Sequence, residues 1–510
     1  MWWAFVGLGP IILIGVSDLL QKKHAIRRNF PILGRGRYIM EDLRPKLYQY
    51  FIESETDGAP INRINRSIVY QRAKHELDTT PFGTQINVYD VGYEWLNHSI
   101  AAKVAQANEI EHRILIGNDQ CTQKYSSSLL NISAMSFGSL SKNAIMALNG
   151  GAKIGGFAHN TGEGGVSPFH LKHGGDLIYQ VGTGYFGCRA DDGNFSKEKF
   201  LKRLENPEIK MIEVKLSQGA KPGHGGILPA RKNTPEIAAI RDIKPGVDVL
   251  SPPFHRAFST PIGLLEFLQH LRELSGGKPV GFKLCVGWRS EFLAICKAIV
   301  QTGIYPDFVA VDGGEGGTGA APQEFTNSVG MPYREGLAFV HDALMGFDIR
   351  EQMRIVASGK IISGFDMAKS FALGADVCQS ARAMMLALGC IQALECHKNT
   401  CPTGVATQDK ELIAGLSVDN KKVRVANYHK ETVKSLAELT AASGLDSHTE
   451  MNRYSINRRI SAQHIMTYAE IYPYIGRGCL LYEDSIPKLF EKDMALADAG
   501  SFKPRFKEVN

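Results

Sequence analysis

Three cysteines lie close together in the last third of the chain: Cys390, Cys396 and Cys401, the last followed directly by Pro402. Thiolates at such short spacing can surround a soft metal centre, and a proline directly after the last cysteine is typical of iron-sulfur ligand loops. Inert buried thiols are one alternative. A zinc site completed by His397 is a weaker one, because His397 adjoins Cys396. The spacing favours an iron-sulfur cluster.

Two further segments have the composition of phosphate-binding loops. Each combines small residues with one basic residue: Ser358, Gly359 and Lys360 in the first, and Ser380, Ala381 and Arg382 in the second. Each follows one of the last two strands expected below, where β/α barrels bind phosphate through backbone N-H groups. The positive charges of Lys360 and Arg382 could neutralise the anion. The pattern predicts a site for the phosphate of a flavin or a sugar.

Glycine is dense in four segments: residues 160–165, 182–184, 219–226 and 313–319. Glycine at strand ends lets the backbone approach a large flat ligand closely, which suits an isoalloxazine ring. Cations are expected on the same face: Lys215, Lys221, Lys283 and Arg289. Lysines at strand ends could bind substrate carboxylates, and Lys283 follows apolar residues that should bury its stem.

Eight short apolar segments are expected to position these groups as strands: residues 132–136, 154–158, 177–181, 211–215, 280–284, 308–311, 355–358 and 377–380. Each precedes a helix-like stretch, which is typical of parallel strands. The fold class predicted is α/β, a (β/α)8 TIM barrel with its active face after the strands. A ninth segment, 247–250, is expected outside the barrel. An open doubly wound sheet is the rival, disfavoured because no Gly-x-Gly-x-x-Gly opens a βαβ unit.

Composition restricts the remaining possibilities. The 510 residues carry a net charge of +6 with scattered basic residues, which disfavours nucleic acid as a partner. Nine unevenly spaced cysteines indicate a reducing compartment. The expected domains are an anchor over residues 1–23, a helical accessory region over 24–125, the barrel over 126–440 and a helical extension over 441–510.

The first twenty residues are mostly apolar, with Asp18 near the end of the run. Basic residues follow directly: Lys22, Lys23, Arg27 and Arg28. By the positive-inside rule, this pattern predicts an N-terminal membrane helix that anchors a cytoplasmic catalytic domain to the cell membrane. An apolar helix docked on the protein and an export signal are the alternatives.

Six motifs occur in an order that resembles the FMN domain of glutamate synthases. They are residues 133–141 (SAMSFGSLS), 160–165 (NTGEGG), 218–223 (QGAKPG), 251–253 (SPP), 316–320 (GGTGA) and the cysteine segment 390–408. The resemblance covers roughly residues 130–440. It implies an FMN-binding barrel, a 3Fe-4S cluster on the three cysteines, and reductive amination of 2-oxoglutarate.

In the implied chemistry, ammonia and 2-oxoglutarate form 2-iminoglutarate, which FMN reduces with electrons supplied by the cluster. The residues expected in catalysis are Lys283, Gln218 and Glu163. The residues expected at FMN are Ser133, Ala134, Met135, Ser136, Gln180, Lys283 and the two phosphate loops.

Two departures qualify the resemblance. His224 stands where glutamate synthases usually carry a glutamate, so another amine such as methylamine is an alternative donor, as in an N-methylglutamate-synthase-like enzyme. The chain also begins without the catalytic cysteine of a glutamine amidotransferase and has no nicotinamide fingerprint. Ammonia is therefore expected from a separate glutaminase subunit, and electrons from ferredoxin or an NAD(P)H reductase subunit.

Two other classes of function stay open at this point. One is a membrane-associated electron-transfer subunit that has lost amination, an alternative that rests on His224. The other is an FMN barrel that oxidises 2-hydroxy acids, which would not need three clustered cysteines.

Overall fold

The computed structural model describes residues 2–76, 79–105 and 112–506, with side chains from Gly7 onward. The chain forms two compact units, Met1–Ile64 and Asn65–Asn510. Each unit is described by itself.

The first unit is helical and folds back on itself around one buried carboxylate. Its elements are α1 (Trp2–Leu20), α2 (Ala25–Asn29), α3 (Leu33–Leu47) and the π-helical turn η1 (Tyr48–Ile52). The Asp18 carboxylate is fully buried and accepts hydrogen bonds from Arg27 Nε at 2.9 Å, Arg35 Nε at 2.8 Å and the Ile32 amide at 3.1 Å. The hydrogen bond from Arg35 is the main reason that the pKa of Asp18 lies well below its ordinary value.

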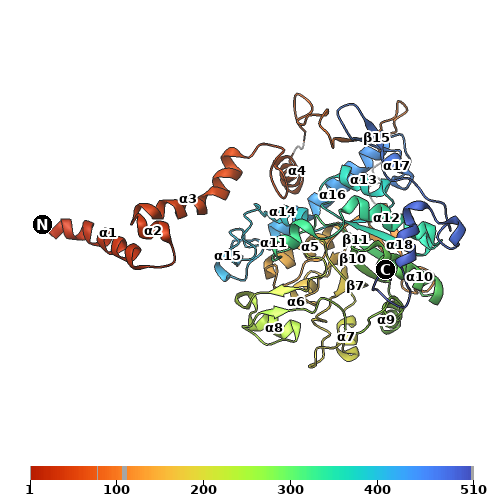
Figure 1. Cartoon of the computed structure of the whole chain (residues 1–510), viewed down its shortest axis with the longest axis horizontal. Helices are drawn as coiled ribbons and strands as arrows, with labels where there is room; N and C mark the ends of the chain where they lie inside the picture. The colour runs from red at the N-terminus through yellow and green to blue at the C-terminus, as the bar shows by residue number, and fades with distance from the viewer. Residues whose placement is uncertain (1, 77–78, 106–111, 507–510) are drawn as a thin grey trace. The chain divides into compact units, whose positions relative to one another are not determined.

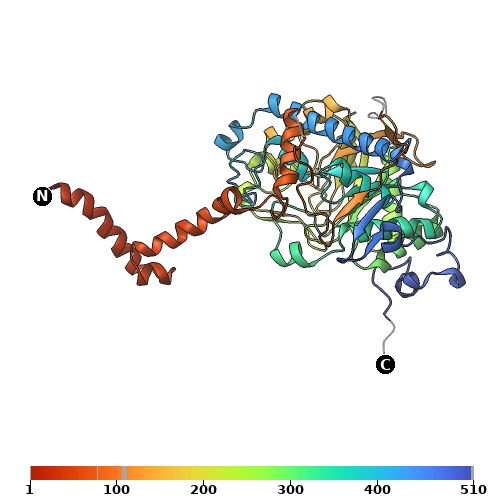
Figure 2. The same ribbon diagram turned by 90° about the horizontal axis from the view of Figure 1, so that it is seen from above.

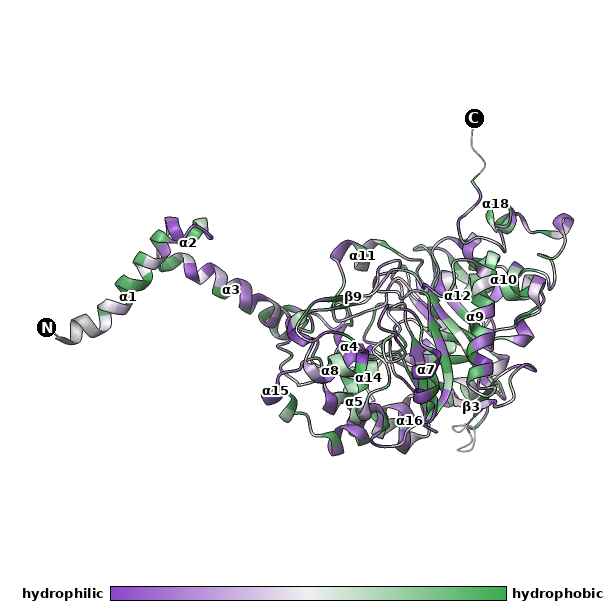
Figure 3. Ribbon diagram, turned by 90° about the horizontal axis from the view of Figure 1, so that it is seen from below, coloured by the Kyte–Doolittle hydropathy of each residue, from purple (hydrophilic) through white to green (hydrophobic). Residues whose placement is uncertain are grey.

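The expected membrane anchor over residues 1–23 is wrong. In the described part of the chain, no helix combines the length and the apolar character needed to cross a bilayer. The apolar segment that suggested a membrane-spanning helix includes Asp18. The carboxylate of this residue forms ion pairs with Arg27 and Arg35 within the helical hairpin. Figure 3 shows mostly hydrophobic residues along the described part of α1 and more hydrophilic residues along α2 and α3. The expected attachment of the catalytic domain to the cell membrane depended on this anchor and is therefore also wrong.

Replacing Asp18 by asparagine is expected to open this hairpin. The neutral amide keeps the shape of the side chain but loses its charge-assisted hydrogen bonds to Arg27 and Arg35. Trypsin should then cut the full-length protein faster after these arginines. Glu41→Gln is the matched control, because Glu41 forms only an exposed pair with Arg37. Equal cleavage rates in the two variants would contradict the role given to Asp18.

The second unit is built on a closed barrel of eight parallel strands (Figures 1 and 2). The strands are β4 (Leu130–Ile132), β5 (His159–Asn160), β6 (Leu177–Val181), β7 (Ile209–Lys215), β10 (Val280–Cys285), β11 (Phe308–Asp312), β12 (Arg354–Ser358) and β13 (Val377–Ser380). Neighbours in sequence are neighbours in the barrel, and β13 pairs with β4 to close it. The predicted (β/α)8 barrel is confirmed.

Two predicted strands differ from the observed ones. Residues 154–158 were expected as a strand, but α5 (Lys142–Gly155) continues into this segment and ends at Gly156, whose φ is +66°. The strand begins later, at His159. The first strand ends at Ile132, so residues 133–136 form the loop that follows it. The segment near 247–250 contains β9 (Val249–Leu250), which pairs with β8 (Ile227–Leu228) outside the barrel as predicted.

Helices follow the strands and surround the barrel (Figure 2). They are α5, α6 (Pro168–Leu171), α7 (Lys197–Leu204), α8 (Pro235–Arg241), α9 (Pro261–Leu274), α10 (Arg289–Thr302), α11 (Gln323–Ser328), α12 (Tyr333–Gly346), α13 (Gly364–Ala372), α14 (Arg382–Leu388), α15 (Lys410–Ala414) and α16 (Val418–Ala442). Short 3-10 turns are η3 (Ala230–Lys232) and η4 (Arg350–Gln352). The α5 helix is capped by Ser141, whose hydroxyl accepts from the Ala144 amide at 3.2 Å.

The amino ends of the strands are covered by the hairpin of β2 (Arg113–Ile116) and β3 (Tyr125–Ser128). Ile116 and Tyr125 of this hairpin join the barrel core with Ile178, Phe308 and Val356. This end of the barrel is therefore closed by apolar packing, which leaves the carboxyl ends for function.

The flanking segments of the second unit pack at different places around the barrel. They comprise α4 (Arg63–Lys74), β1 (Glu94–Leu96), η5 (His448–Glu450), β14 (Ile456–Arg459), β15 (Ile465–Thr467), α17 (Tyr468–Ile471), η6 (Glu483–Ser485) and α18 (Lys488–Leu496). Strand β1 pairs with β14, although they lie at opposite ends of the sequence. Arg453 is fully buried and its Nη2 donates to Asp342 of α12 at 2.6 Å, which fastens the C-terminal segment to the barrel.

Candidate active site at the carboxyl ends of the strands

A buried polar cluster lies inside the barrel on β5, β6 and β7. The Glu213 carboxylate accepts from Asn160 Nδ2 at 2.8 Å and from Gln180 Nε2 at 2.6 Å, both through Oε1. Its other oxygen, Oε2, is buried and makes no hydrogen bond within the described residues. A barrel interior is normally filled by branched apolar side chains, so these polar groups mark a place where the interior serves more than packing.

Lys283 forms the second part of the site. Its Nζ lies 3.2 Å from Asp312 Oδ1, and both side chains are almost completely buried. Burial alone would lower the pKa of Lys283, but the negative charges of Asp312 and Glu213 outweigh it and raise the pKa above its ordinary value. Lys283 is therefore protonated at neutral pH and lies near the carboxyl end of β10.

Glu163, Lys215 and Gln218 form the third part. Lys215 Nζ lies 3.0 Å from Glu163 Oε2 and donates to Gln218 Oε1 at 2.7 Å. Burial would raise the pKa of Glu163, but the charge of Lys215 and its hydrogen bond lower it overall. The carboxylate is therefore ionised at neutral pH.

The three residues expected in catalysis are brought into one network. Glu163 and Gln218 share Lys215, and the amide of Gly219, next to Gln218, donates to Asp312 Oδ2 at 3.0 Å. Asp312 in turn pairs with Lys283. Their proximity is a structural finding, while their catalytic roles stay predictions.

Lys221 adds a titratable cation to this face. Its side chain is buried, and burial is the main cause that lowers its pKa from 10.5 to about 8. The charge of Glu163 opposes the shift and the charge of Lys215 adds to it. A lysine with a pKa near neutrality can exchange a proton under physiological conditions.

The lowered pKa of Lys221 is expected to make the free energy of unfolding depend on pH. Because the unfolded chain keeps the Lys221 proton up to 10.5 and the folded chain loses it at about 8, unfolding binds a proton between these values. The free energy of unfolding of the wild type should therefore rise with pH across this window, relative to Lys221→Met. Urea unfolding at several pH values measures the difference. Lys210→Met, at an exposed lysine, is the control; a pH-independent difference for Lys221→Met would refute the shift.

The two predicted phosphate loops lie next to each other and to the loop after β4. Ser133 Oγ lies 3.3 Å from Ser358 Oγ, and the Ser133 amide donates to the Ser380 carbonyl at 3.0 Å. Arg382 Nη2 donates to the Glu315 carbonyl at 2.7 Å. Burial lowers the pKa of Lys360, and the nearby positive charge of Arg382 lowers it further. Two cations are thus held close together.

Glycine is required at two points of this face. A Cβ on Gly359 would lie 2.3 Å from the Tyr333 ring, and a Cβ on Gly162 would lie 2.8 Å from the Ser136 amide nitrogen. Gly162 also has a φ of +65°. Ala134 and Met135 lie in the same β4 loop, and the Met135 amide donates to the Asn160 carbonyl at 3.2 Å. Most of the residues predicted for FMN therefore lie in adjoining loops or at the strand ends before them, while Gln180 and Lys283 lie on β6 and β10.

The cysteine loop follows α14. Gly389, with a φ of +106°, ends this helix, and the carbonyl of Cys390 accepts from the Tyr70 hydroxyl at 2.7 Å. Burial raises the pKa of Cys390 to about 12, with smaller contributions from the charges of Cys396 and Cys401. Within the ranges described, no three His, Cys, Asp or Glu side chains are arranged to hold a metal ion. The cluster ligands stay a prediction.

Cys401 differs from the other two cysteines. Burial would raise the pKa of its thiol, but hydrogen bonds from the Thr403 hydroxyl and from the amides of Ala406, Thr403 and Val405 lower it overall. N-H groups that point at a sulfur favour the thiolate, which is the form that binds metals.

Several functional groups were not singled out from the sequence. Glu213 lies inside the predicted strand 211–215 and Asp312 directly after the predicted strand 308–311, although an acidic residue within an otherwise apolar strand is itself a signal. Arg289 was expected on the active face, but its guanidinium lies over Phe339 and Phe490 and pairs with Asp493 of α18. It belongs to the packing of the C-terminal segment.

His224 lies at the edge of the face, in the loop after β7. Its ring meets Phe325 edge-on at a centroid distance of 5.2 Å, and its Nδ1 lies 2.9 Å from the Gly225 carbonyl oxygen. The residue that departs from the motif of glutamate synthases is therefore next to an aromatic side chain of α11.

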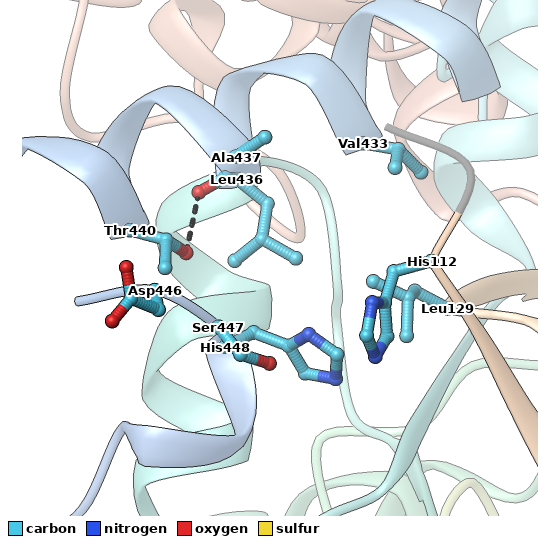
Figure 4. A pocket seen from close by; sticks show the side chains of 9 residues that line it. All are labelled: His112, Leu129, Val433, Leu436, Ala437, Thr440, Asp446, Ser447 and His448. Atoms are coloured by element: carbon cyan, nitrogen blue, oxygen red, sulfur yellow. Dashed lines mark hydrogen bonds between the residues drawn. The ribbon is translucent and has the colours of Figure 1, made fainter. Parts of the chain in front are cut away.

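A separate small cavity lies away from this face. It is lined by residues that include Leu129, just before β4, His448 and four residues of α16 (Figure 4). The figure shows His448 pointing toward His112, and the ring centroids are 5.0 Å apart. Its lining contains none of the residues predicted for catalysis or cofactor binding.

Fold and site together define an α/β-barrel protein with a charged, glycine-lined active face and a cysteine loop next to it. Residues 85–446, well over half of the chain, match a family model described as a conserved region in glutamate synthase. The chain belongs to the glutamate synthase family and is an oxidoreductase of the glutamate synthase type, acting on CH-NH2 donors.

Curated relatives agree with this assignment. The glutamate synthase large subunit-like protein YerD of Bacillus subtilis is 37% identical over 480 residues, which cover 86% of this chain and 91% of the relative. The archaeal glutamate synthase [NADPH] of Methanocaldococcus jannaschii is 36% identical over 62% of this chain, and the match spans 59% of that relative.

Solved structures resemble the chain more distantly. A flavocytochrome b2 variant with sulfite bound is 11% identical, with a TM-score of 0.44 and coverage of 89% of this chain and 92% of that one. A mandelate oxidase with (S)-4-hydroxymandelic acid is 13% identical, with a TM-score of 0.43 and coverage of 83% and 99%.

Proposed function

We propose that the protein catalyses the reductive amination of 2-oxoglutarate to glutamate through 2-iminoglutarate, with FMN and a 3Fe-4S cluster as its cofactors. The observation that carries the proposal is the group of buried lysines at one end of the barrel: Lys215, Lys221 and Lys283. 2-Oxoglutarate has two carboxylates. Buried ammonium groups whose charge is only partly neutralised by protein carboxylates can bind such a dianion.

The adjoining loops fit FMN. Lys360 and Arg382 hold two positive charges close together, which favours a phosphate between the loops after β12 and β13. The glycines at 162 and 359 allow these loops to pack closely, because a side chain at either position would collide with Ser136 or Tyr333. When bound, FMN supplies the hydride that reduces the imine carbon.

The chain's own residues can assist imine formation. When ammonia adds to a carbonyl, water leaves only after its oxygen receives a proton. Lys221 Nζ, with a pKa of about 8, can donate that proton and recover it from solvent or product. Lys283 and the Lys215–Glu163 pair orient the substrate by charge, and the raised pKa of Lys283 and the lowered pKa of Glu163 keep these two groups ionised at neutral pH.

The donor set of the cysteine loop fits an iron-sulfur cluster. Hydrogen bonds from Thr403 and neighbouring amides lower the pKa of Cys401, and the charge of Cys401 adds to burial in raising the pKa values of Cys390 and Cys396. The three cysteines need not converge on one point to hold a cluster, because each thiolate of an iron-sulfur site binds a different iron atom. We propose ferredoxin or an NAD(P)H reductase subunit as the electron donor, and a separate glutaminase subunit as a source of ammonia.

A second amine donor is favoured by one observation. His224 replaces the usual glutamate and packs against Phe325, which makes this edge of the site less acidic and more apolar. Such surroundings suit the methyl group of methylamine better than a carboxylate does. The alternative product is N-methylglutamate.

The proposal is tested with the purified full-length protein under anaerobic conditions. The protein is loaded with FMN and iron, reduced with dithionite, and mixed with 2-oxoglutarate and either ammonium or methylamine. Reoxidation of the flavin absorbance, together with glutamate or N-methylglutamate in the product, is the expected result. Flavin that stays reduced with both amines would refute the proposal.

A further inference from the structure

Lys232, in the excursion between β7 and α9, is a buried cation outside the network described above. Its side chain is only 4% exposed, and its Nζ donates to two carbonyl oxygens, that of Ser139 at 3.3 Å and that of Ala406 at 3.1 Å. Among the residues that the structure describes, no carboxylate lies within ion-pair distance of this ammonium group. Burying a charge without a counter-charge is costly, so a negative group is expected next to it.

The cysteine loop lies on the side where that counter-charge is expected. Burial lowers the pKa of Lys232, and the charges of Cys396 and Cys401 oppose this by raising it. Ala406, whose carbonyl binds Lys232, also points its amide at the Cys401 sulfur. The next residue back, Arg231, donates from Nη2 to the carbonyl of His397 at 2.5 Å.

Lys232 also reaches the loop after β4, which contains the residues predicted at FMN. Ser139, its other acceptor, lies in this loop. The same loop is bound to the cysteine segment by Gln408 Nε2, which donates to the Leu140 carbonyl at 3.0 Å, and by the Ser141 amide, which donates to the Val405 carbonyl at 2.9 Å. Lys232 therefore lies at the junction of the cysteine loop and the predicted flavin loop.

We infer that Lys232 is a positioning residue that provides the buried positive charge for the iron-sulfur cluster and thereby raises its reduction potential. The inference rests on the cluster of the proposed function. Uptake of one electron from a one-electron donor makes the cluster more negative by one charge. A fixed ammonium group in a poorly hydrated place stabilises that charge more than water at the surface does. The electron is then more readily accepted next to the flavin loop.

The test is a redox titration of the full-length protein followed by the EPR signal of the oxidised cluster. Lys232→Gln keeps an N-H donor for the Ser139 or Ala406 carbonyl but removes the charge. At a fixed applied potential, its ratio of reduced to oxidised cluster is expected to fall about tenfold, which corresponds to about 59 mV for a one-electron couple. Lys232→Arg should restore most of the ratio.

Lys244→Gln is the matched control, because it removes an exposed positive charge from the same excursion and should leave the ratio nearly unchanged. An unchanged ratio in Lys232→Gln, with the iron content of the wild type, would overturn the inference and leave the proposed function intact. Loss of iron from Lys232→Gln but not from Lys232→Arg would support a requirement for charge. Loss from both would overturn it, and a wild type without any cluster would refute the proposed cluster itself.

Discussion

Lys283→Met is expected to lower kcat/KM for glutamate formation by roughly 10²- to 10³-fold, the usual cost of removing one electrostatic group from an active site. The methionine keeps most of the length of the side chain but removes the charge that faces Asp312 and Glu213. Under the proposed function, this charge binds the substrate or stabilises charge that develops on it. Steady-state rates at saturating amine, with flavin content checked, measure the effect.

Two controls separate this effect from unfolding. Lys210→Met removes an exposed lysine at the amino-terminal end of β7 and should keep full activity. Lys283→Arg keeps the charge in a larger side chain and should recover part of the rate. Because Lys283→Met leaves the buried Asp312 carboxylate with the Gly219 amide as its one hydrogen-bond donor among the described residues, the thermal midpoint of the variant is expected to fall as well. Activity like that of the wild type in a folded Lys283→Met protein would contradict the site.

Cys401→Ala is expected to remove nearly all cluster iron from the protein. Cys401 is the thiol whose pKa is lowered by hydrogen bonds from Thr403 and neighbouring amides, so it is the sulfur best prepared to bind iron. Loss of one of three ligands should abolish the EPR signal, while FMN bound at the barrel loops stays in place. Iron analysis and flavin absorbance of the same sample measure both cofactors.

Cys479→Ala is the matched control for that experiment. Cys479 is also a free cysteine, but it lies in the C-terminal segment between α17 and η6. Its replacement should leave the iron content unchanged. A Cys401→Ala protein that keeps its iron and its EPR signal, as Cys479→Ala does, would show that Cys401 is not a ligand of the cluster.

Much of the fold was predictable from local sequence patterns. Seven of the predicted strand segments overlap a barrel strand, because a buried parallel strand is a short apolar run followed by a turn. The prediction of a strand over residues 154–158 was wrong for a local reason as well. The helical pattern of α5 continues to Gly155, and the strand after it is only His159–Asn160. A two-residue strand leaves almost no periodicity to detect.

The N-terminal segment shows where composition misleads. Its apolar run predicted a membrane helix, yet Asp18 is buried between Arg27 and Arg35. A hydropathy pattern counts a single aspartate as a small interruption. Its hydrogen bonds depend on how the chain turns after Leu20, which residue types along a helix do not reveal.

The sequence by itself determined the barrel, the cysteine spacing, the two phosphate-type loops and the motifs of the glutamate synthase family, because each depends on residues close together in the chain. Only the tertiary structure decided that Lys283 faces Asp312, that Gln180 and Asn160 meet at Glu213, and that Lys232 bridges Ser139 and Ala406. These partners are separated by up to 174 residues. Such pairs form when barrel closure brings strand ends together, and no local pattern specifies which side chains then meet.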